Sequence, residues 1–200
     1  MSSSLTLLLS TLIPGIIWVL IIWLTIPHST TSFKSFFRFF LYGVISAALI
    51  PYFYRVFPGY SFEMTELDSD ILTAAFLRIA PLEEILKCLC FVMACSTIPR
   101  NSHPTIYLGY GGVLGLGFAV LENLEYGIRY GHDVAAIRSC TSSVLHVGCG
   151  IAFSWFFSLG LCIKKWSRNR LDLIFRKFSI LKIITYCLIG LLFCIFTHGY

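Results

Sequence analysis

Six long apolar runs dominate this chain and constrain its fold more than any other feature. A transmembrane helix needs about 20 predominantly apolar residues, and the runs lie at about 5–26, 36–54, 71–98, 105–128, 134–163 and 180–199. Hydrophobic residues make up 57% of the chain and charged residues 12%, whereas a soluble domain carries about 25% charged residues. The sequence therefore predicts an all-α, polytopic helical bundle of about six transmembrane helices. We expect one membrane domain, residues 1–200, in a multi-pass cell-membrane protein.

The charged loops predict the orientation of this bundle in the lipid bilayer, which is its first expected partner. Basic residues favour the cytoplasmic side, and segment 164–182 carries most of them, whereas loop 55–70 is acidic. The first, third and fifth loops are therefore expected inside and both termini outside. The net charge of +5 reflects this topology, so no nucleic-acid partner is expected. The eight cysteines lie in or beside apolar runs without CxxC pairs, which predicts small buried residues rather than disulfides.

The stretch Pro81–Lys87 places three charged side chains, Glu83, Glu84 and Lys87, inside the third run. A charged residue at the centre of a bilayer costs about 2.5–3.5 kcal/mol, so this cluster needs either pairing or a function. Glu83 and Lys87 are separated by four residues on a helix, and Glu84 and Lys87 by three. Either carboxylate can therefore pair with Lys87 while the other faces a pocket, and the spacing does not decide which.

Three other runs carry polar groups at a matching depth. Glu122 and Asn123 lie in the fourth run, His146 in the fifth and His198 at the end of the sixth. At about 1.5 Å of rise per residue, all of them fit one pocket with the Glu83–Glu84 pair in the outer half of the bilayer. The basic residues Arg78, Lys87 and Arg138 are expected to form ion pairs or to pack against other helices. Glu125 is expected to lie at the membrane surface.

A glycine run, Gly109–Gly117, opens the fourth apolar run. No strand is expected before it, so a phosphate-binding loop is excluded. Small residues such as Gly111 and Gly115 instead let membrane helices approach closely. We therefore expect these glycines to bring the polar end of this helix against its neighbours.

Carboxylates and imidazoles at one depth point to hydrolysis. A Glu and two His can hold Zn²⁺ with a further Glu as general base, and the candidate ligands are Glu83, Glu122, His146 and His198. Alternatively a Glu activates water directly while His or Asn stabilises the oxyanion. Because no HExxH motif is present, the use of a metal stays open. The candidate catalytic residues are Glu83, Glu84, Glu122, Asn123 and His146.

Two other kinds of protein fit the same polar residues. A small ion- or proton-coupled transporter also buries acids and histidines, although the chain lacks inverted repeats. A pseudo-enzyme that binds a membrane partner in the same groove is the other alternative.

The order of these motifs resembles the PrsW family of intramembrane proteases. Glu83-Glu84-Ile-Leu-Lys87 resembles the EExxK motif of the family. Residues 115–126 resemble its glycine-rich stretch, which ends in Glu-Asn and an aromatic residue. Arg138 together with His146 resembles its third motif. The resemblance covers about residues 75–200, and His198 is similar to the family's final histidine. The family is related to the CAAX-processing and bacteriocin-processing membrane proteases, so a prenyl-protein endopeptidase is the nearest enzyme alternative.

The resemblance implies an intramembrane endopeptidase with a four-helix catalytic core at 71–200 and two accessory spans at 1–54. It also implies site residues Glu83, Glu84, Glu122, His146 and His198, and a metal- or glutamate-dependent mechanism. The expected substrate is a single-pass membrane protein similar to an anti-sigma factor, cut near the extracytoplasmic face.

Overall fold

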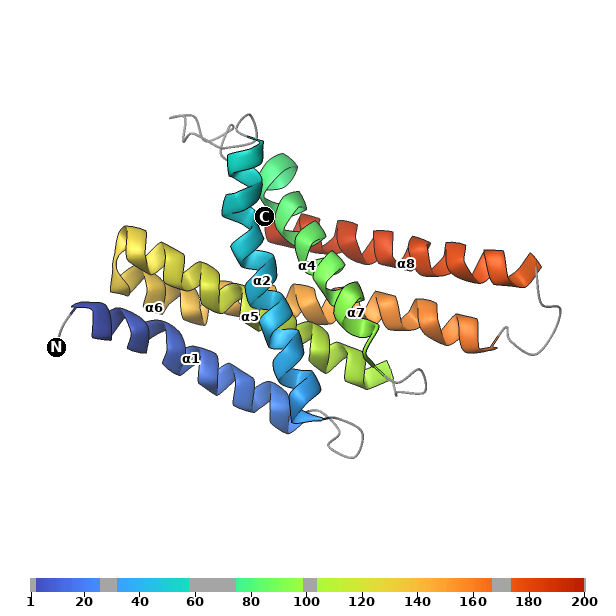
Figure 1. The fold of residues 1–200 in the computed structure, drawn as a ribbon, viewed down its shortest axis with the longest axis horizontal. Coiled ribbons are helices and arrows are strands. Elements are labelled where there is room, and N and C mark those ends of the chain that lie inside the picture. The colour runs from blue at the N-terminus through green and yellow to red at the C-terminus, as the bar shows by residue number, and fades with distance from the viewer. Residues whose placement is uncertain (1–2, 26–31, 58–74, 99–103, 167–173, 200) are drawn as a thin grey trace.

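The computed structural model describes residues 3–25, 32–57, 75–98, 104–166 and 174–199 (Figure 1). In these ranges the chain forms helices and no strand, as the sequence predicts. The helices are α1 (Ser3–Thr25), α2 (Phe33–Val56), the π-helix η2 (Ala75–Ile79), α4 (Ala80–Cys95), α5 (Pro104–Tyr130), α6 (His132–Cys140), α7 (Ser142–Trp166) and α8 (Ile174–Gly199). The acidic loop residues that support the predicted orientation lie outside the described residues: Glu63, Glu66, Asp68 and Asp70.

Five helices of the described part are long and apolar enough to cross a membrane, against about six predicted spans. The predicted span 71–98 is the one not among them. Helix α4 has 16 residues, and with the 5 residues of η2 directly before it the chain is helical from Ala75 to Cys95, which is about as long as the roughly 30 Å hydrocarbon core. The charges of the Pro81–Lys87 stretch lower its hydropathy. The η2–α4 helix is therefore long enough for the predicted span, and its charged side chains set it apart from the five apolar helices.

The predicted span 134–163 is divided into α6 and α7 by a break at Thr141. Two hydroxyl groups compete with the helical backbone there, because Ser139 Oγ donates to the Ala135 carbonyl at 2.7 Å and Thr141 Oγ1 to the Ile137 carbonyl at 3.0 Å. Such bonds bend or weaken a helix. Polar residues from both sides of this break, Arg138 and Ser143, contact the candidate site.

Helix α5 is the centre of the bundle. In its most apolar window 67% of the residues are buried, compared with 17% in α1 and 11% in α8. Figure 1 shows α5 running beside α7, with α2 crossing it steeply and α8 on the far side of α7. The exposed apolar faces of α1 and α8 are those expected of lipid-facing helices.

Glycines on two faces of α5 allow its close contacts with α2 and α7. A Cβ atom at Gly115 would collide with the His146 carbonyl on α7, and one at Gly117 with the Phe40 carbonyl on α2. Gly111 and Gly150 face one another across the same α5–α7 crossing. The close approach expected from the glycine run is present, and it places His146 directly against α5.

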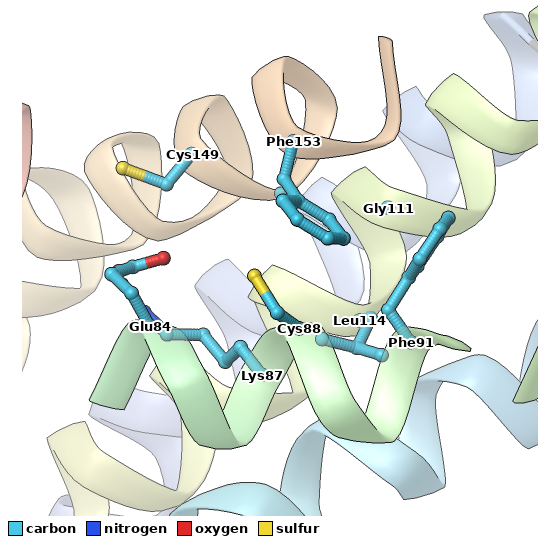
Figure 2. A pocket seen from close by; sticks show the side chains of 9 residues that line it. Glu84, Lys87, Cys88, Phe91, Gly111, Leu114, Cys149 and Phe153 are labelled. Carbon is cyan, nitrogen blue, oxygen red and sulfur yellow. The ribbon is translucent and has the colours of Figure 1, made fainter. Parts of the chain in front are cut away.

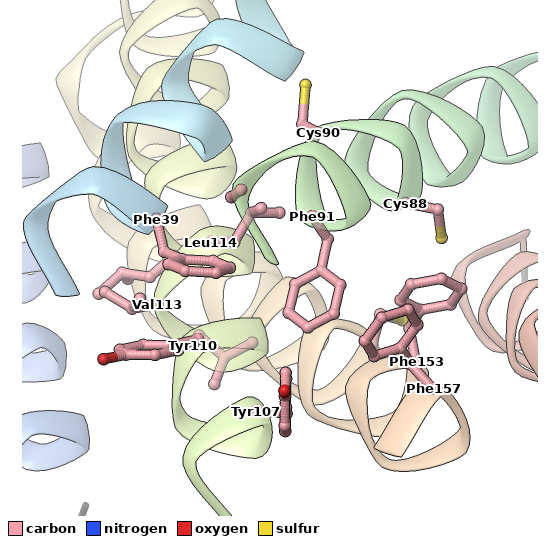
Figure 3. Packing of buried hydrophobic residues seen from close by; sticks show 14 of the residues in the cluster. Phe39, Cys88, Cys90, Phe91, Tyr107, Tyr110, Val113, Leu114, Phe153 and Phe157 are labelled. Atoms are coloured by element: carbon pink, nitrogen blue, oxygen red, sulfur yellow. The ribbon is translucent and has the colours of Figure 1, made fainter. Parts of the chain in front are cut away.

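Aromatic side chains pack α4 against its neighbours on the C-terminal side of Glu83, Glu84 and Lys87. Phe91 of α4 contacts Phe39 of α2 and Phe153 and Phe157 of α7 edge-on, with ring centroids 5.5–5.7 Å apart (Figure 3). Phe39 in turn stacks on Tyr110 of α5 at 4.5 Å. Each such pair contributes about 0.5–1.5 kcal/mol beyond burial alone. This cluster begins two turns beyond Glu84 and therefore fixes where the charged turn of α4 lies.

Gly115→Ala is expected to lower the melting temperature of the detergent-purified protein, because the added methyl group collides with backbone that cannot rotate away. Gly148→Ala is the matched control, since Gly148 lies on α7 and a Cβ there meets nothing within 4 Å. Thermal unfolding followed by circular dichroism compares the two. Equal melting temperatures would show that the α5–α7 contact is not tight.

Candidate active site

The first turn of α4 buries two carboxylates, and one of them pairs with a lysine. Pro81 lies at the start of α4, where a backbone N–H group is not needed for a hydrogen bond within α4. Glu83, Glu84 and Lys87 are each at most 5% exposed. Lys87 Nζ donates to Glu84 Oε1 at 2.6 Å and also lies over the ring of Phe118. The question that the sequence left open is thus answered: Glu84 is the carboxylate neutralised by Lys87.

His146 of α7 is fully enclosed and bonded through both ring nitrogens. Lys87 Nζ lies 3.1 Å from His146 Nδ1, and Glu122 Oε2 of α5 lies 2.7 Å from His146 Nε2. An ammonium group only donates, so Nδ1 is the acceptor and Nε2 carries the proton that Glu122 accepts. The imidazole therefore joins α4 to α5 at the level of the charged turn.

Glu122 is held by a second cation, Arg138 of α6. Arg138 Nη2 lies 2.8 Å from Glu122 Oε2, donates to Ser142 Oγ at 3.1 Å, and its guanidinium lies over the Tyr126 ring. This is the pairing role expected for Arg138. The sequence does not point to Ser142, because serine is not unusual in a membrane helix, whereas Tyr126 is the aromatic residue that ends the glycine-rich stretch of the resemblance.

Asn123 connects α5 to α7 through Ser143. Its Nδ2 donates to Ser143 Oγ at 3.0 Å, while its buried Oδ1 has no hydrogen-bond partner within the described residues. This contact is a bond between two helices. The catalytic role stays a prediction.

His198, in the last turn of α8, completes the site from a fourth helix. Its Nδ1 donates to Glu84 Oε1 at 2.8 Å, and its Nε2 faces Glu83 Oε2 at 3.5 Å. Glu83 Oε2 is buried and has no hydrogen-bond partner in the part of the chain that the structure describes. Because Nδ1 carries the ring proton of a neutral His198, its Nε2 is a hydrogen-bond acceptor. His198 Nε2 and Glu83 Oε2 are therefore two acceptors that face each other without a hydrogen bond between them.

This arrangement fits a divalent metal ion. One ligand atom each from Glu83, His146 and His198 lies within 4.8 Å of the others. Two imidazoles and a carboxylate are the donors of catalytic zinc sites, and the Glu84–His198 bond is the outer carboxylate–histidine contact that orients such a ligand. His146 joins by exchanging one of its two ring hydrogen bonds for the ion. Glu122, also a predicted ligand, lies outside this group and instead contacts His146 and Arg138.

A small cavity and two further cysteines adjoin the site. The cavity lies between α4, α5 and α7, is lined by Glu84, Lys87, Cys88 and Cys149 among others, and has about 10 Å³ of room for the centre of a water molecule (Figure 2). Cys149 follows His146 by three residues and Cys194 precedes His198 by four, so helical spacing could have placed both beside the site. The seven cysteines whose side chains the structure describes are free thiols, and Cys140 departs from the prediction because it is exposed.

Comparison with known proteins assigns this chain to a family. The family model described as PrsW family intramembrane metalloprotease matches residues 31–199. Protease PrsW of Bacillus subtilis (strain 168) is 28% identical over 160 residues, which cover 76% of this chain and 70% of that protein. No solved structure matches the chain. With its candidate membrane spans and its Glu/His cluster, this multi-pass membrane protein belongs to the PrsW family of intramembrane metalloproteases, whose activity is proteolysis.

Proposed function

We propose that this protein is an endopeptidase that cuts a single-pass membrane protein, similar to an anti-sigma factor, near the extracytoplasmic side of the membrane. The observation that carries the proposal is the unpartnered Oε2 of Glu83, buried beside His146 and His198. A buried carboxylate oxygen without a donor is costly to a protein, so its retention favours a use in chemistry. The depth of the site, which the sequence places in the outer half of the bilayer, supports the position of the cut.

Glu83 is the proposed general base. Glu84 cannot easily take a proton, because Lys87 and His198 both donate to its Oε1. Glu122 is likewise occupied, by Arg138 and His146. Among the described residues Glu83 pairs with no lysine or arginine, and its buried Oε2 has no hydrogen-bond partner there, so it is the proposed acceptor of the proton of the attacking water. A base so positioned contributes about 10²–10⁴-fold in rate.

Of the three donors of this cluster, His146 and His198 would hold the metal ion, and Glu83 is proposed to act as the base rather than as the third ligand. Zn²⁺ is the proposed ion. When bound, it would polarise the scissile carbonyl and acidify a water molecule. The remaining residues keep the two imidazoles in place. Glu84 fixes the ring of His198, and Arg138 balances the charge of Glu122. The ring of His146 would be fixed by the one of its two partners, Lys87 or Glu122, whose hydrogen bond the ion does not replace. Asn123 holds α5 against α7 through Ser143.

A transporter remains the alternative of another class, favoured by the buried Glu122–Arg138 pair. The decisive experiment reconstitutes the purified protein in liposomes with a single-pass reporter protein carrying fluorescent labels on both sides of its membrane span. We expect cleavage by the wild type and none by His146→Ala. Proton flux that depends on Glu122, without cleavage of any reporter, would contradict the proposal.

The prenyl-protein endopeptidase alternative differs in the side of the membrane that the site faces. A cysteine-accessibility or fusion reporter placed in segment 164–179 locates that loop. We expect it in the cytoplasm, which puts the site on the opposite, extracytoplasmic side. An extracytoplasmic loop would favour the prenyl-protein enzyme instead.

A further inference from the structure

Two thiols and a carboxylate lie close together next to the candidate active site, with which they share Glu84. One ligand atom each from Glu84, Cys149 and Cys194 lies within 4.8 Å of the others, and all three residues are buried. They come from α4, α7 and α8. The proposed function uses Glu84 only to orient His198 and does not use the cysteines at all.

The two cysteines face each other across the α7–α8 contact. Cys194 Sγ lies 3.2 Å from the Cys149 carbonyl oxygen, and Cys149 Sγ lies 3.9 Å from the Cys194 carbonyl oxygen. Thr197 Oγ1 lies 3.5 Å from Cys149 Sγ on the same face. Both sulfurs are thus enclosed between the helices and close to the Glu84 carboxylate, which Figure 2 shows across from Cys149.

We propose that Cys149, Cys194 and Glu84 form a second metal site, which takes a thiophilic divalent cation and inhibits proteolysis when occupied. Ligand atoms at about 2.3 Å from a tetrahedral ion are about 3.8 Å apart, so the observed cluster needs to contract by only about 1 Å. Sulfur donors select zinc, cadmium and similar ions over magnesium and calcium. The cavity beside Glu84 and Cys149 has room for a water molecule as the fourth ligand.

The charges at this site also balance. Two thiolates and a carboxylate carry three negative charges, and a divalent cation leaves one. The ammonium group of Lys87, 2.6 Å from Glu84 Oε1, supplies the remaining positive charge. A buried cluster with no net charge avoids the large cost of an unpaired ion in a low-dielectric region.

Inhibition follows from the double role of Glu84. The carboxylate that would bind the second ion is the one that accepts the hydrogen bond from His198 Nδ1. An ion on the thiol side draws this carboxylate toward α7 and α8 and weakens the bond that orients His198. The binding of the ion stands on the cluster alone, whereas its inhibitory effect rests on the proposed function.

The test is titration of the full-length, metal-free protein in detergent with Cd²⁺ under a phosphine reductant. The ultraviolet charge-transfer band of cadmium–thiolate bonds reports on binding without any need for cleavage. We expect a band that saturates at one ion per chain in the wild type and in His198→Ala, and its loss in Cys149→Ser/Cys194→Ser. Cys88→Ser, which changes another thiol of the same cavity, is the matched control and should keep the band. An equal band in the double serine variant would overturn the site.

The inhibitory role is tested with the reporter substrate on protein that carries a single equivalent of Zn²⁺, so that the ion serves the active site and the thiol site is left for Cd²⁺. We expect Cd²⁺ to suppress wild-type cleavage reversibly, and at least tenfold more Cd²⁺ to be needed for Cys149→Ser/Cys194→Ser. Equal sensitivity of the two proteins, with the band present only in the wild type, would refute the regulatory role while leaving the metal site. Absence of cleavage by every protein tested would refute the proposed function and leave the binding result intact. Thermal unfolding confirms that Cys149→Ser/Cys194→Ser and Cys88→Ser are folded.

Discussion

Glu83→Gln is expected to lower the rate of reporter cleavage by about 10²–10⁴-fold, the usual contribution of a general base. The amide has nearly the same volume as the carboxylate but cannot take up a proton from water. Because no hydrogen bond within the described residues depends on Glu83 Oε2, the substitution should leave the fold unchanged. Because His146 and His198 are the proposed ligands, the metal content should also be retained.

Glu125→Gln is the matched control, an identical change on α5 at a carboxylate outside the cluster. It should cleave at the wild-type rate. Cleavage and metal content are measured on the same preparations of both variants. Wild-type turnover by Glu83→Gln would remove Glu83 from the mechanism, and loss of the metal from this variant would make Glu83 a ligand instead of the base.

Lys87→Met is expected to destabilise the protein by about 3–5 kcal/mol, the usual effect of removing one partner of a buried ion pair. Lys87 bonds both Glu84 and His146, so its loss leaves the Glu84 charge buried without its cation. The double variant Lys87→Met/Glu84→Gln should recover part of the lost stability because the unpaired charge is gone. It should remain impaired in cleavage, since Lys87 no longer orients His146 and a glutamine replaces the charged partner of His198.

The stability comparison uses chemical unfolding in mixed micelles, with Lys182→Met as the control for an exposed lysine on α8. That control should unfold as the wild type does. A Lys87→Met protein as stable as Lys182→Met, or a double variant less stable than Lys87→Met alone, would show that the Glu84–Lys87 pair is not the electrostatic centre of this site.

Much of this fold follows from the sequence because the membrane restricts the choices. An apolar run in lipid must satisfy its own backbone hydrogen bonds, so helices were the expected outcome. The glycines of α5 likewise have one physical use in such a helix, close packing, and they have it here. The π-helical turn η2 at the start of this span was harder to predict, because hydropathy does not report which hydrogen-bond pattern a helix adopts.

The meeting of Glu83, Glu84, Glu122, His146 and His198 could be expected from their shared depth, whereas the partners within the cluster could not. Helical spacing allows Lys87 to reach either Glu83 or Glu84, and only the position of His198 on α8 makes Glu84 the shared acceptor. The break at Thr141 that brings Arg138 to Glu122 depends on competing hydroxyl bonds, which hydropathy does not report. The pairing of Cys149 with Cys194 depends in the same way on how α7 and α8 are packed.

The central claim is that His146 and His198 hold a metal that Glu83 uses to cleave a peptide bond within the membrane. Its most direct test is the metal content of the purified protein, measured together with reporter cleavage before and after chelation. We predict a bound divalent ion in the wild type, loss of cleavage on chelation, recovery with one equivalent of Zn²⁺, and one bound ion fewer in His146→Ala/His198→Ala than in the wild type. Full cleavage by metal-free wild-type protein would contradict the metal-dependent mechanism and favour water activated by glutamate alone.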